Sequence, residues 1–163
     1  MSGVVWRFGD DVDTDVLAPG PYMKAPIAEL AAHSLEALEP RFAAGVRPGD
    51  VIVAGENFGA GSSREQAVLA LRELGVGAVI ARSFAGIFYR NALNLGLLTL
   101  VCSDPSALEA GQRVEVDPAG ATVRVLDTGT VVVCESIPGH LLEMVADGGL
   151  VPHLERRFRG GRR

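Results

Sequence analysis

Cysteine is scarce in this chain, with only Cys102 and Cys134 among 163 residues. Two cysteines so far apart supply neither a Cys-x-x-Cys metal motif nor a disulfide framework, and they cannot complete a zinc or an iron–sulfur site. The three histidines also lack the spacing of metal ligands. The sequence therefore predicts no metal site in this chain, and it predicts that both cysteines are buried as small hydrophobic residues.

The chain also lacks a long apolar run and an excess of basic residues. No stretch reaches the length of a membrane span without a charge or a glycine, and the N-terminus has no basic segment followed by an apolar one. From these two features we expect a cytoplasmic protein. The net charge of −5 disfavours general binding to nucleic acid or an anionic membrane. Because 48% of the residues are hydrophobic and only 21% are charged, we expect a partner protein to cover some apolar surface.

The alternation of apolar runs and turn residues predicts an α/β fold in one domain, residues 1–163. Strands at 51–54, 78–81 and 97–101 are separated by helical patterns that begin at Ala67 and at Ser83, which favours a largely parallel central sheet.

The outer parts of the chain have different patterns. A strand at 4–8 and a helix at 27–38 precede the central part. Short antiparallel strands are predicted in the last third, at 114–116, 122–125 and 131–133. A helix at 138–145 follows, and the arginine-rich residues from about 155 to 163 are predicted to form a flexible tail.

Residues 51–66 join an apolar strand to a helix through a glycine-rich turn, and they read Val-Ile-Val-Ala-Gly-Glu-Asn-Phe-Gly-Ala-Gly-Ser-Ser-Arg-Glu-Gln. Ser62, Ser63 and Arg64 stand where the helix should begin, and backbone N–H groups at a helix start attract anions. The guanidinium of Arg64 adds a forked binder of carboxylates. This segment therefore predicts a site for a carboxylate or a phosphate.

The same residues also have a purely structural interpretation. Ser62 stands three residues before Glu65, and Ser63 three before Gln66, so both pairs match a capping box, in which serine only satisfies helix N–H groups. Arg64 in the first helical turn would oppose the helix dipole, however, and an anionic ligand would explain its presence there. The residues alone leave both interpretations open.

Four aspartates follow the first strand, at positions 10, 11, 13 and 15. Such a run can ligate a hard cation, but short acidic runs more often form turns with Asx-type hydrogen bonds, and we favour the turn. Asp15 is also a candidate for orienting an active-site group.

Three segments together resemble the small subunit of 3-isopropylmalate dehydratase and homoaconitase, which is the swivelling domain of the aconitase superfamily. Residues 9–15 are similar to the family's Gly-Asp-x-x-(Asp/Asn)-Thr-Asp opening, and residues 53–65 to its Val-Ala-Gly-Glu-Asn-Phe-Gly-x-Gly-Ser-Ser-Arg-Glu signature. Residues 78–91 supply a third match, while Ala60 and Gln66 replace a Cys and a His that are common in the signature. The resemblance implies a swivelling β/β/α domain, with a largely parallel sheet or open barrel flanked by helices and C-terminal antiparallel strands.

The resemblance also implies a hydro-lyase that is active only with a large subunit, in a heterodimer or a heterotetramer. That subunit would hold a [4Fe–4S] cluster, and this chain would bind none alone. The substrate would be a hydroxy di- or tricarboxylic acid, with 3-isopropylmalate, of leucine biosynthesis, favoured.

The family's roles can be carried over to single residues of this chain. Ser62 would be the base that removes the proton alpha to a carboxylate, and Arg64 would hold a substrate carboxylate together with nearby groups of Gly61 and Ser63. Asp15 would order Ser62 or Arg64 through hydrogen bonds. A serine hydroxyl is a poor base in water, so it needs preorganised donors, positive charge and a closed site, and a helix start beside an arginine offers the first two.

The substrate's variable group would be read by the loop that contains Tyr22 and Lys24. Its Met23-Lys24-Ala25 stretch matches neither the isopropylmalate type nor the homoaconitase type, so homoaconitase and dimethylmalate-type dehydratase small subunits stay as alternatives.

Two further classes of function stay open on the residues. The glycines at 55, 59 and 61 after a strand resemble the nucleotide-binding turn of short-chain NAD(P)-dependent oxidoreductases, although no acidic residue ends the next strand and no Tyr-x-x-x-Lys pair follows. A noncatalytic assembly module would keep the fold and use its apolar surface only for binding.

Overall fold

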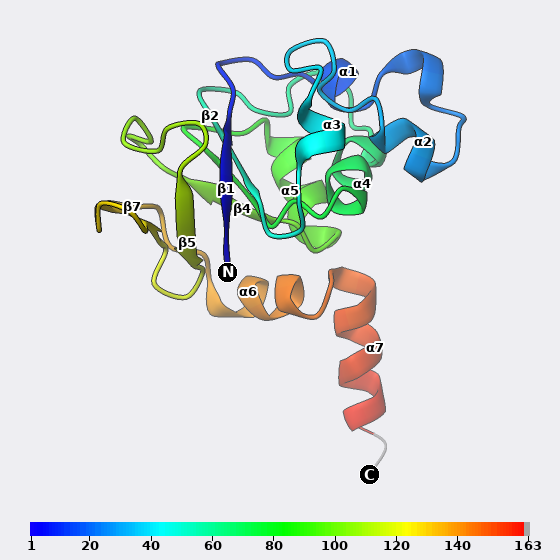
Figure 1. The fold of residues 1–163 in the computed structure, drawn as a ribbon. Coiled ribbons are helices and arrows are strands. Elements are labelled where there is room, and N and C mark those ends of the chain that lie inside the picture. Colours follow the sequence, from blue (N-terminus) through cyan, green and yellow to red (C-terminus); the bar gives the residue numbers. More distant parts are fainter. Residues whose placement is uncertain (162–163) are drawn as a thin grey trace.

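The computed structural model describes residues 1–161, and within them seven strands form one sheet in the order β4-β3-β2-β1-β5-β6-β7. Helices α1 to α5 lie to one side of this sheet, and the chain ends in α7 (Figure 1). The strands are β1 (Ser2–Arg7), β2 (Val51–Ala54), β3 (Ala78–Ala81), β4 (Leu98–Val101), β5 (Arg113–Asp117), β6 (Thr122–Val125) and β7 (Val131–Val133). The helices are α1 (Thr14–Leu17), the 3₁₀ turn η1 (Gly20–Tyr22), α2 (Ile27–Ala31), α3 (Phe42–Gly45), α4 (Glu65–Glu73), α5 (Gly86–Asn94), α6 (Gly139–Ala146) and α7 (Leu150–Gly160).

The sheet has a parallel half and an antiparallel half. Strands β1 to β4 pair in parallel, for example with Val51 opposite Ala78, and β5, β6 and β7 continue from β1 as an antiparallel meander. Helices α4 and α5 are the crossover connections that parallel neighbours need. The predicted fold class is therefore confirmed, with a parallel centre and C-terminal antiparallel strands.

Alternating side chains of the central strands face two separate hydrophobic clusters. Ile52 and Ala54 of β2 pack with residues of α1, α2, α4 and α5 on one face. Val51 and Val53 pack on the other face, against the curled β5–β7 half of the sheet and against α6. All four β2 residues are buried, as expected for a parallel strand that is covered on both faces.

The C-terminal helices extend beyond the layer formed by α1 to α5 and contact it through α5. Helix α6 packs its Leu141, Leu142 and Val145 against the second cluster, and α7 projects away from the sheet (Figure 1). We expected a flexible tail from about residue 155, but residues 155–160 are the C-terminal half of α7. The arginines at 162 and 163 lie outside the described residues. No helix within residues 1–161 is long and apolar enough to span a membrane.

The predicted helix at 27–38 is wrong in its extent, because α2 ends at Ala31. Leu35 has a φ of +61°, which breaks the helical path, and its N–H donates to the carbonyl of Val16 at 2.9 Å. Leu35 is completely buried. The apolar spacing of this segment therefore reflects burial in a chain of turns, and a long-range hydrogen bond replaces the helical one.

Candidate active site

Two loops meet at the edge of the sheet where the parallel strands end. Because β1 and β2 are parallel neighbours, the segments that follow them lie side by side. Four backbone hydrogen bonds join them, one of which runs from Gly55 to Gly9 at 3.1 Å. Asp11 donates to Glu56 at 2.8 Å, Gly59 to Val12 at 2.7 Å, and Thr14 to Ala60 at 2.8 Å. These bonds set the first sequence motif, residues 9–15, against the second, residues 53–65.

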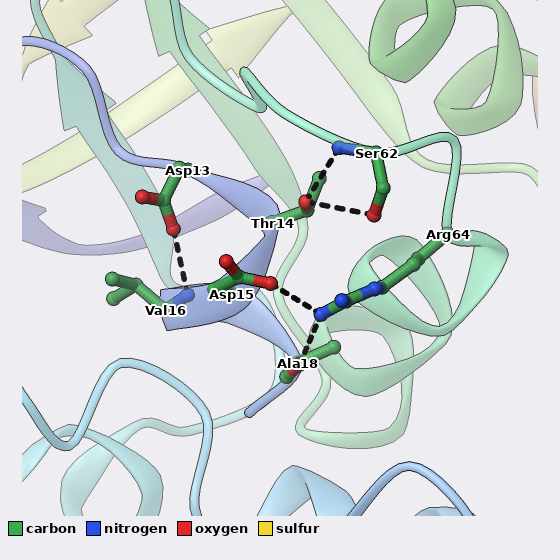
Figure 2. Close-up of polar contacts among 7 residues, drawn as sticks. All are labelled: Asp13, Thr14, Asp15, Val16, Ala18, Ser62 and Arg64. Atoms are coloured by element: carbon green, nitrogen blue, oxygen red, sulfur yellow. Dashed lines mark hydrogen bonds and ion pairs between the residues drawn. The ribbon is translucent and has the colours of Figure 1, made fainter. Parts of the chain in front are cut away.

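Thr14 is the buried contact between the two motifs. Its side-chain Oγ1 accepts a hydrogen bond from the backbone N–H of Ser62 at 3.1 Å and lies 3.3 Å from the Ser62 Oγ (Figure 2). Thr14 is only 2% exposed, whereas Ser62 lies on the surface. Thr14 therefore orients the serine from beneath. Sequence reasoning missed it, although it stands directly before Asp15 in the first motif.

Arg64 folds back across α1. Its Nη1 donates to Asp15 Oδ1 at 2.5 Å and lies 3.4 Å from the carbonyl oxygen of Ala18, at the end of that helix (Figure 2). The side chain of Arg64 is 30% exposed and that of Asp15 is 72% exposed. Asp15 thus contacts Arg64, one of its two expected partners, while Thr14 contacts Ser62.

The capping-box interpretation of the serines is wrong. Helix α4 begins at Glu65, its N-cap residue is Arg64, and no side chain caps it. The backbone N–H groups of residues 63–66 find no acceptor among the described residues. Several unsatisfied donors at a helix start, with an arginine beside them, make a good binding position for an anion.

Gly61 allows the turn to pass over Thr14. Its φ of +106° is strained for any residue with a side chain, and a Cβ there would lie 2.9 Å from Thr14 Oγ1. This glycine therefore shapes the site through its backbone.

Of the four aspartates in the first motif, only Asp13 makes the predicted local turn, whereas the other three bond to the loop after β2. Asp13 caps α1 by accepting from the Val16 N–H at 2.9 Å, and Asp10 accepts from the Glu56 N–H at 2.7 Å. Within residues 1–161, no group of three or more His, Cys, Asp or Glu side chains is placed to hold a metal ion.

Among the described residues, the other candidates form no hydrogen bond with the Ser62 hydroxyl. Ser63 is exposed, and its carbonyl oxygen lies 3.4 Å from the Asn91 side-chain amide. The ring of Tyr22 stacks on His33 at a centroid distance of 3.7 Å, so its aromatic face is occupied. Lys24 is exposed and forms no hydrogen bond or ion pair with the part of the chain that is described. The structure thus brings together Ser62, Arg64 and Asp15, while Tyr22 and Lys24 belong to the loop that continues from Ala18.

Comparisons with known proteins identify the family of this chain. The chain is 48% identical to 3-isopropylmalate dehydratase small subunit 1 of Methanopyrus kandleri, over 96% of this chain and 93% of that protein. The chain belongs to the family of 3-isopropylmalate dehydratase and homoaconitase small subunits. It is also 47% identical to the methanogen homoaconitase small subunit of Methanothermobacter thermautotrophicus, over 94% of this chain and 89% of that protein.

A family model and a solved structure agree with this family assignment. Residues 43–105, which contain the serine-arginine turn, match the model of the aconitase C-terminal domain. The fold superposes on a crystal structure of 3-isopropylmalate dehydratase from Methanocaldococcus jannaschii with a TM-score of 0.91 and 45% identity, covering 97% of this chain and 95% of that one. The hydro-lyase family therefore accounts for the glycine-rich turn, which the oxidoreductase interpretation also used.

Proposed function

We propose that this chain is the small subunit of a 3-isopropylmalate dehydratase and supplies one wall of an active site that a large subunit completes. The observation that carries this proposal is the cluster of Ser62, Arg64 and unpartnered α4 N–H groups on an open surface. A serine exposed to water is a weak base. A second subunit that covers this surface would exclude water and strengthen every electrostatic contact in the site.

Arg64 and the start of α4 are proposed to hold a carboxylate of the substrate. The Asp15 carboxylate holds one end of the guanidinium, and the other nitrogens stay free to donate to a second carboxylate. The N–H groups of residues 63–66 have no acceptor among the described residues, so they are free to donate to an anion at the start of α4. The substrate class that fits is a small hydroxy acid with at least two carboxylates.

Ser62, as an alkoxide stabilised by the nearby donors and Arg64, is proposed to take the proton from the carbon alpha to that carboxylate and to become a hydroxyl group. The C–H electron pair then forms the new carbon–carbon double bond, and hydroxide leaves from the neighbouring carbon. Thr14 fixes the serine by its contact with Ser62 Oγ and Ser62 N. The bound carboxylate takes up negative charge that develops at the alpha carbon, so Arg64 would stabilise the transition state more than the ground state.

The residues of this chain do not fit an iron–sulfur cluster, because such clusters use several cysteine thiolates and this chain has two cysteines in all. We propose that a [4Fe–4S] cluster of the large subunit supplies the Lewis acid for the leaving hydroxyl group. The proposed complex is cytoplasmic, and either one or two copies of each subunit are compatible with one site per pair.

The proposal is tested by a substitution at Ser62 in the assembled enzyme. Ser62→Ala should lower kcat by several orders of magnitude when the chain is coexpressed with its large subunit and loaded with iron, because loss of a catalytic base costs several kcal/mol of barrier. Ser2→Ala is the matched control, since Ser2 is the first residue of β1, whereas the site follows the last residue of that strand. Wild-type turnover by the Ser62→Ala complex, with normal subunit assembly and iron content, would exclude the proposed base.

The same assay distinguishes the possible substrates. We expect the highest kcat/KM for 3-isopropylmalate in a panel that also contains homocitrate and dimethylmalate. Lys24 is exposed in the loop after Ala18, so Lys24→Met should change the ranking within this panel if that loop reads the variable group. A complex that forms but acts on none of these acids would favour the noncatalytic assembly module.

A further inference from the structure

The two edge strands of the sheet meet, although they stand at opposite ends of the strand order. The backbone N–H of Glu135, just after β7, donates to the carbonyl of Val101 at the end of β4 at 2.7 Å. Strand β4 runs parallel to β1, and the meander of three antiparallel steps makes β7 run the opposite way. The contact is therefore an antiparallel seam, which closes the curled sheet.

The hydrogen-bond directions define the register at this seam. Cys102 donates its N–H to the carbonyl of Ala81 of β3, and Cys134 donates its N–H to the carbonyl of Ala121 beside β6. The N–H groups of both cysteines therefore point away from the seam. The single bond from Glu135 N–H to the Val101 carbonyl places residues 101 and 135 opposite each other, as in a hydrogen-bonded antiparallel pair, and the next pair along is of the non-hydrogen-bonded kind. Cys102 and Cys134 are that next pair. Their Cα atoms should thus lie about 4.5 Å apart, which is within the usual range for a disulfide.

Both thiols also face the same interior. Cys102 is 1% exposed and Cys134 is 8% exposed, and both belong to the hydrophobic cluster enclosed by the curled sheet. The Cys102 Sγ lies 3.7 Å from the carbonyl oxygen of Val133, the residue before Cys134. Burial raises the pKa of the Cys134 thiol to about 12, and the neighbouring Cys102 thiol adds to this by charge repulsion and hydrogen bonding. The two sulfur atoms are thus neighbours in a dry environment.

We propose that Cys102 and Cys134 form an intramolecular disulfide across the seam when the protein meets a small disulfide oxidant such as oxidised glutathione. Both cysteines are free in the structure, so the described state is the reduced one. The bond would join the first and the last strand of the sheet order and close a loop from residue 102 to residue 134. Cross-linking so long a loop restricts the unfolded chain, and the native protein is stabilised as a result.

The exchange balances without any further reagent. One cysteine thiolate attacks a sulfur of oxidised glutathione, which forms a mixed disulfide and releases one glutathione thiolate. The second cysteine, as its thiolate, then attacks the protein sulfur of the mixed disulfide, which forms the Cys102–Cys134 bond and releases the second glutathione. Two protein thiols are oxidised, and one glutathione disulfide is reduced to two thiols.

Oxidation should be slow at neutral pH and faster at alkaline pH. A raised pKa keeps the Cys134 thiol protonated, and only the thiolate reacts. Access also requires local opening of β7, an edge strand of three residues whose Val133 is 71% exposed. Edge strands with few partners are the parts that open most easily.

The experiment incubates the full chain with oxidised glutathione at neutral and alkaline pH, and then alkylates remaining thiols in denaturant. We expect a mass lower by two hydrogen atoms, no alkylation, and a proteolytic fragment in which the Cys102 and Cys134 peptides are linked. The oxidised protein should also unfold several degrees higher than the reduced protein, and a thiol reductant should reverse both changes.

Single variants provide the controls. Cys102→Ala and Cys134→Ala each retain one thiol, so they should gain at most one glutathione and show no reversible rise in unfolding temperature. Oxidised wild-type protein with two alkylatable thiols, with glutathione on each cysteine, or with a disulfide only between two chains would overturn the proposal. None of these readouts depends on dehydratase activity, so the inference stands or fails separately from the proposed function.

Discussion

The buried Thr14 side chain lies directly beneath the exposed Ser62, with its Oγ1 bonded to the Ser62 N–H and 3.3 Å from the Ser62 Oγ. This contact joins two motifs that are 48 residues apart in the sequence. Thr14 is held in turn by its own N–H, which donates to Ala60. The position of the proposed base is therefore set by a residue of a different loop.

Replacement of Thr14 by valine should lower both stability and activity, by a similar free energy. Thr14→Val keeps the shape of the side chain but leaves the Ser62 N–H without its acceptor, which costs roughly 1–3 kcal/mol. We expect kcat in the assembled complex to fall about 10- to 100-fold, the rate equivalent of such a loss. Thr14→Ser restores the oxygen and should recover most of the rate. A Thr14→Val enzyme with unchanged kcat would show that this contact does not position the serine.

The pair of Arg64 and Asp15 should govern substrate affinity. Arg64→Lys keeps the charge but loses the forked geometry, and Asp15→Asn releases the guanidinium, so both should raise KM roughly tenfold or more. The unfolding temperature should barely change, because ion pairs this exposed contribute little. The exposed pair of Arg41 and Glu39 supplies the control: Glu39→Gln should change neither KM nor stability measurably. Equal effects of Asp15→Asn and Glu39→Gln on KM would remove Asp15 from the site.

Alanine substitutions at two glycines with positive φ distinguish the effect of backbone strain from the effect of crowding in the site. Gly61→Ala and Gly111→Ala both force a side chain into an unfavourable conformation, which costs about 1 kcal/mol of folding stability. Only at Gly61 would the new Cβ press on Thr14 Oγ1, whereas nothing lies within 4 Å of it at Gly111. We therefore expect similar losses in unfolding temperature but a loss of kcat only for Gly61→Ala. The same kcat in both variants would contradict a role for this close approach.

The attachment of α7 should depend on pH through Asp147. Its carboxylate accepts from His153 Nδ1 at 2.7 Å and from Arg156 Nη1 at 2.5 Å, and these bonds, that of His153 foremost, lower the pKa of Asp147. A carboxyl group whose pKa is lower in the folded than in the unfolded protein stabilises the folded protein when the pH is above the unfolded pKa, about 4. This stabilisation is lost as the pH falls through the lower pKa of the folded protein. Amide hydrogen exchange in α7, corrected for intrinsic rates, should therefore rise at acidic pH relative to exchange in β2.

Asp147→Asn supplies the control for this pH effect. It should make exchange in α7 faster at neutral pH and remove most of the difference between neutral and acidic pH. If the variant kept the wild-type pH dependence, another group would have to hold the helix.

Much of the fold was predictable because local patterns and tertiary burial agree in the centre of the chain. The apolar, largely β-branched strands of the centre are covered on both faces, and right-handed crossovers by the helices between them leave few other arrangements. The helix at 27–38 was not predictable, because the bond from Leu35 to Val16 competes with helical hydrogen bonding, and no local pattern reports it. The residues from 155 to 160 looked like a tail, yet the bonds of Asp147 to His153 and Arg156 attach this helix.

The sequence by itself determined the family, the alternation of strands and helices, and the presence of Ser62, Arg64 and Asp15, because these follow from residue identity and spacing. Only the tertiary structure decided that the serines do not cap α4, that Thr14 supports Ser62, and that Cys102 opposes Cys134. The last two are contacts between segments about 30 to 50 residues apart. Their geometry depends on how the ends of parallel strands align and on how the sheet curls closed. Neither property is encoded in any single stretch of the chain.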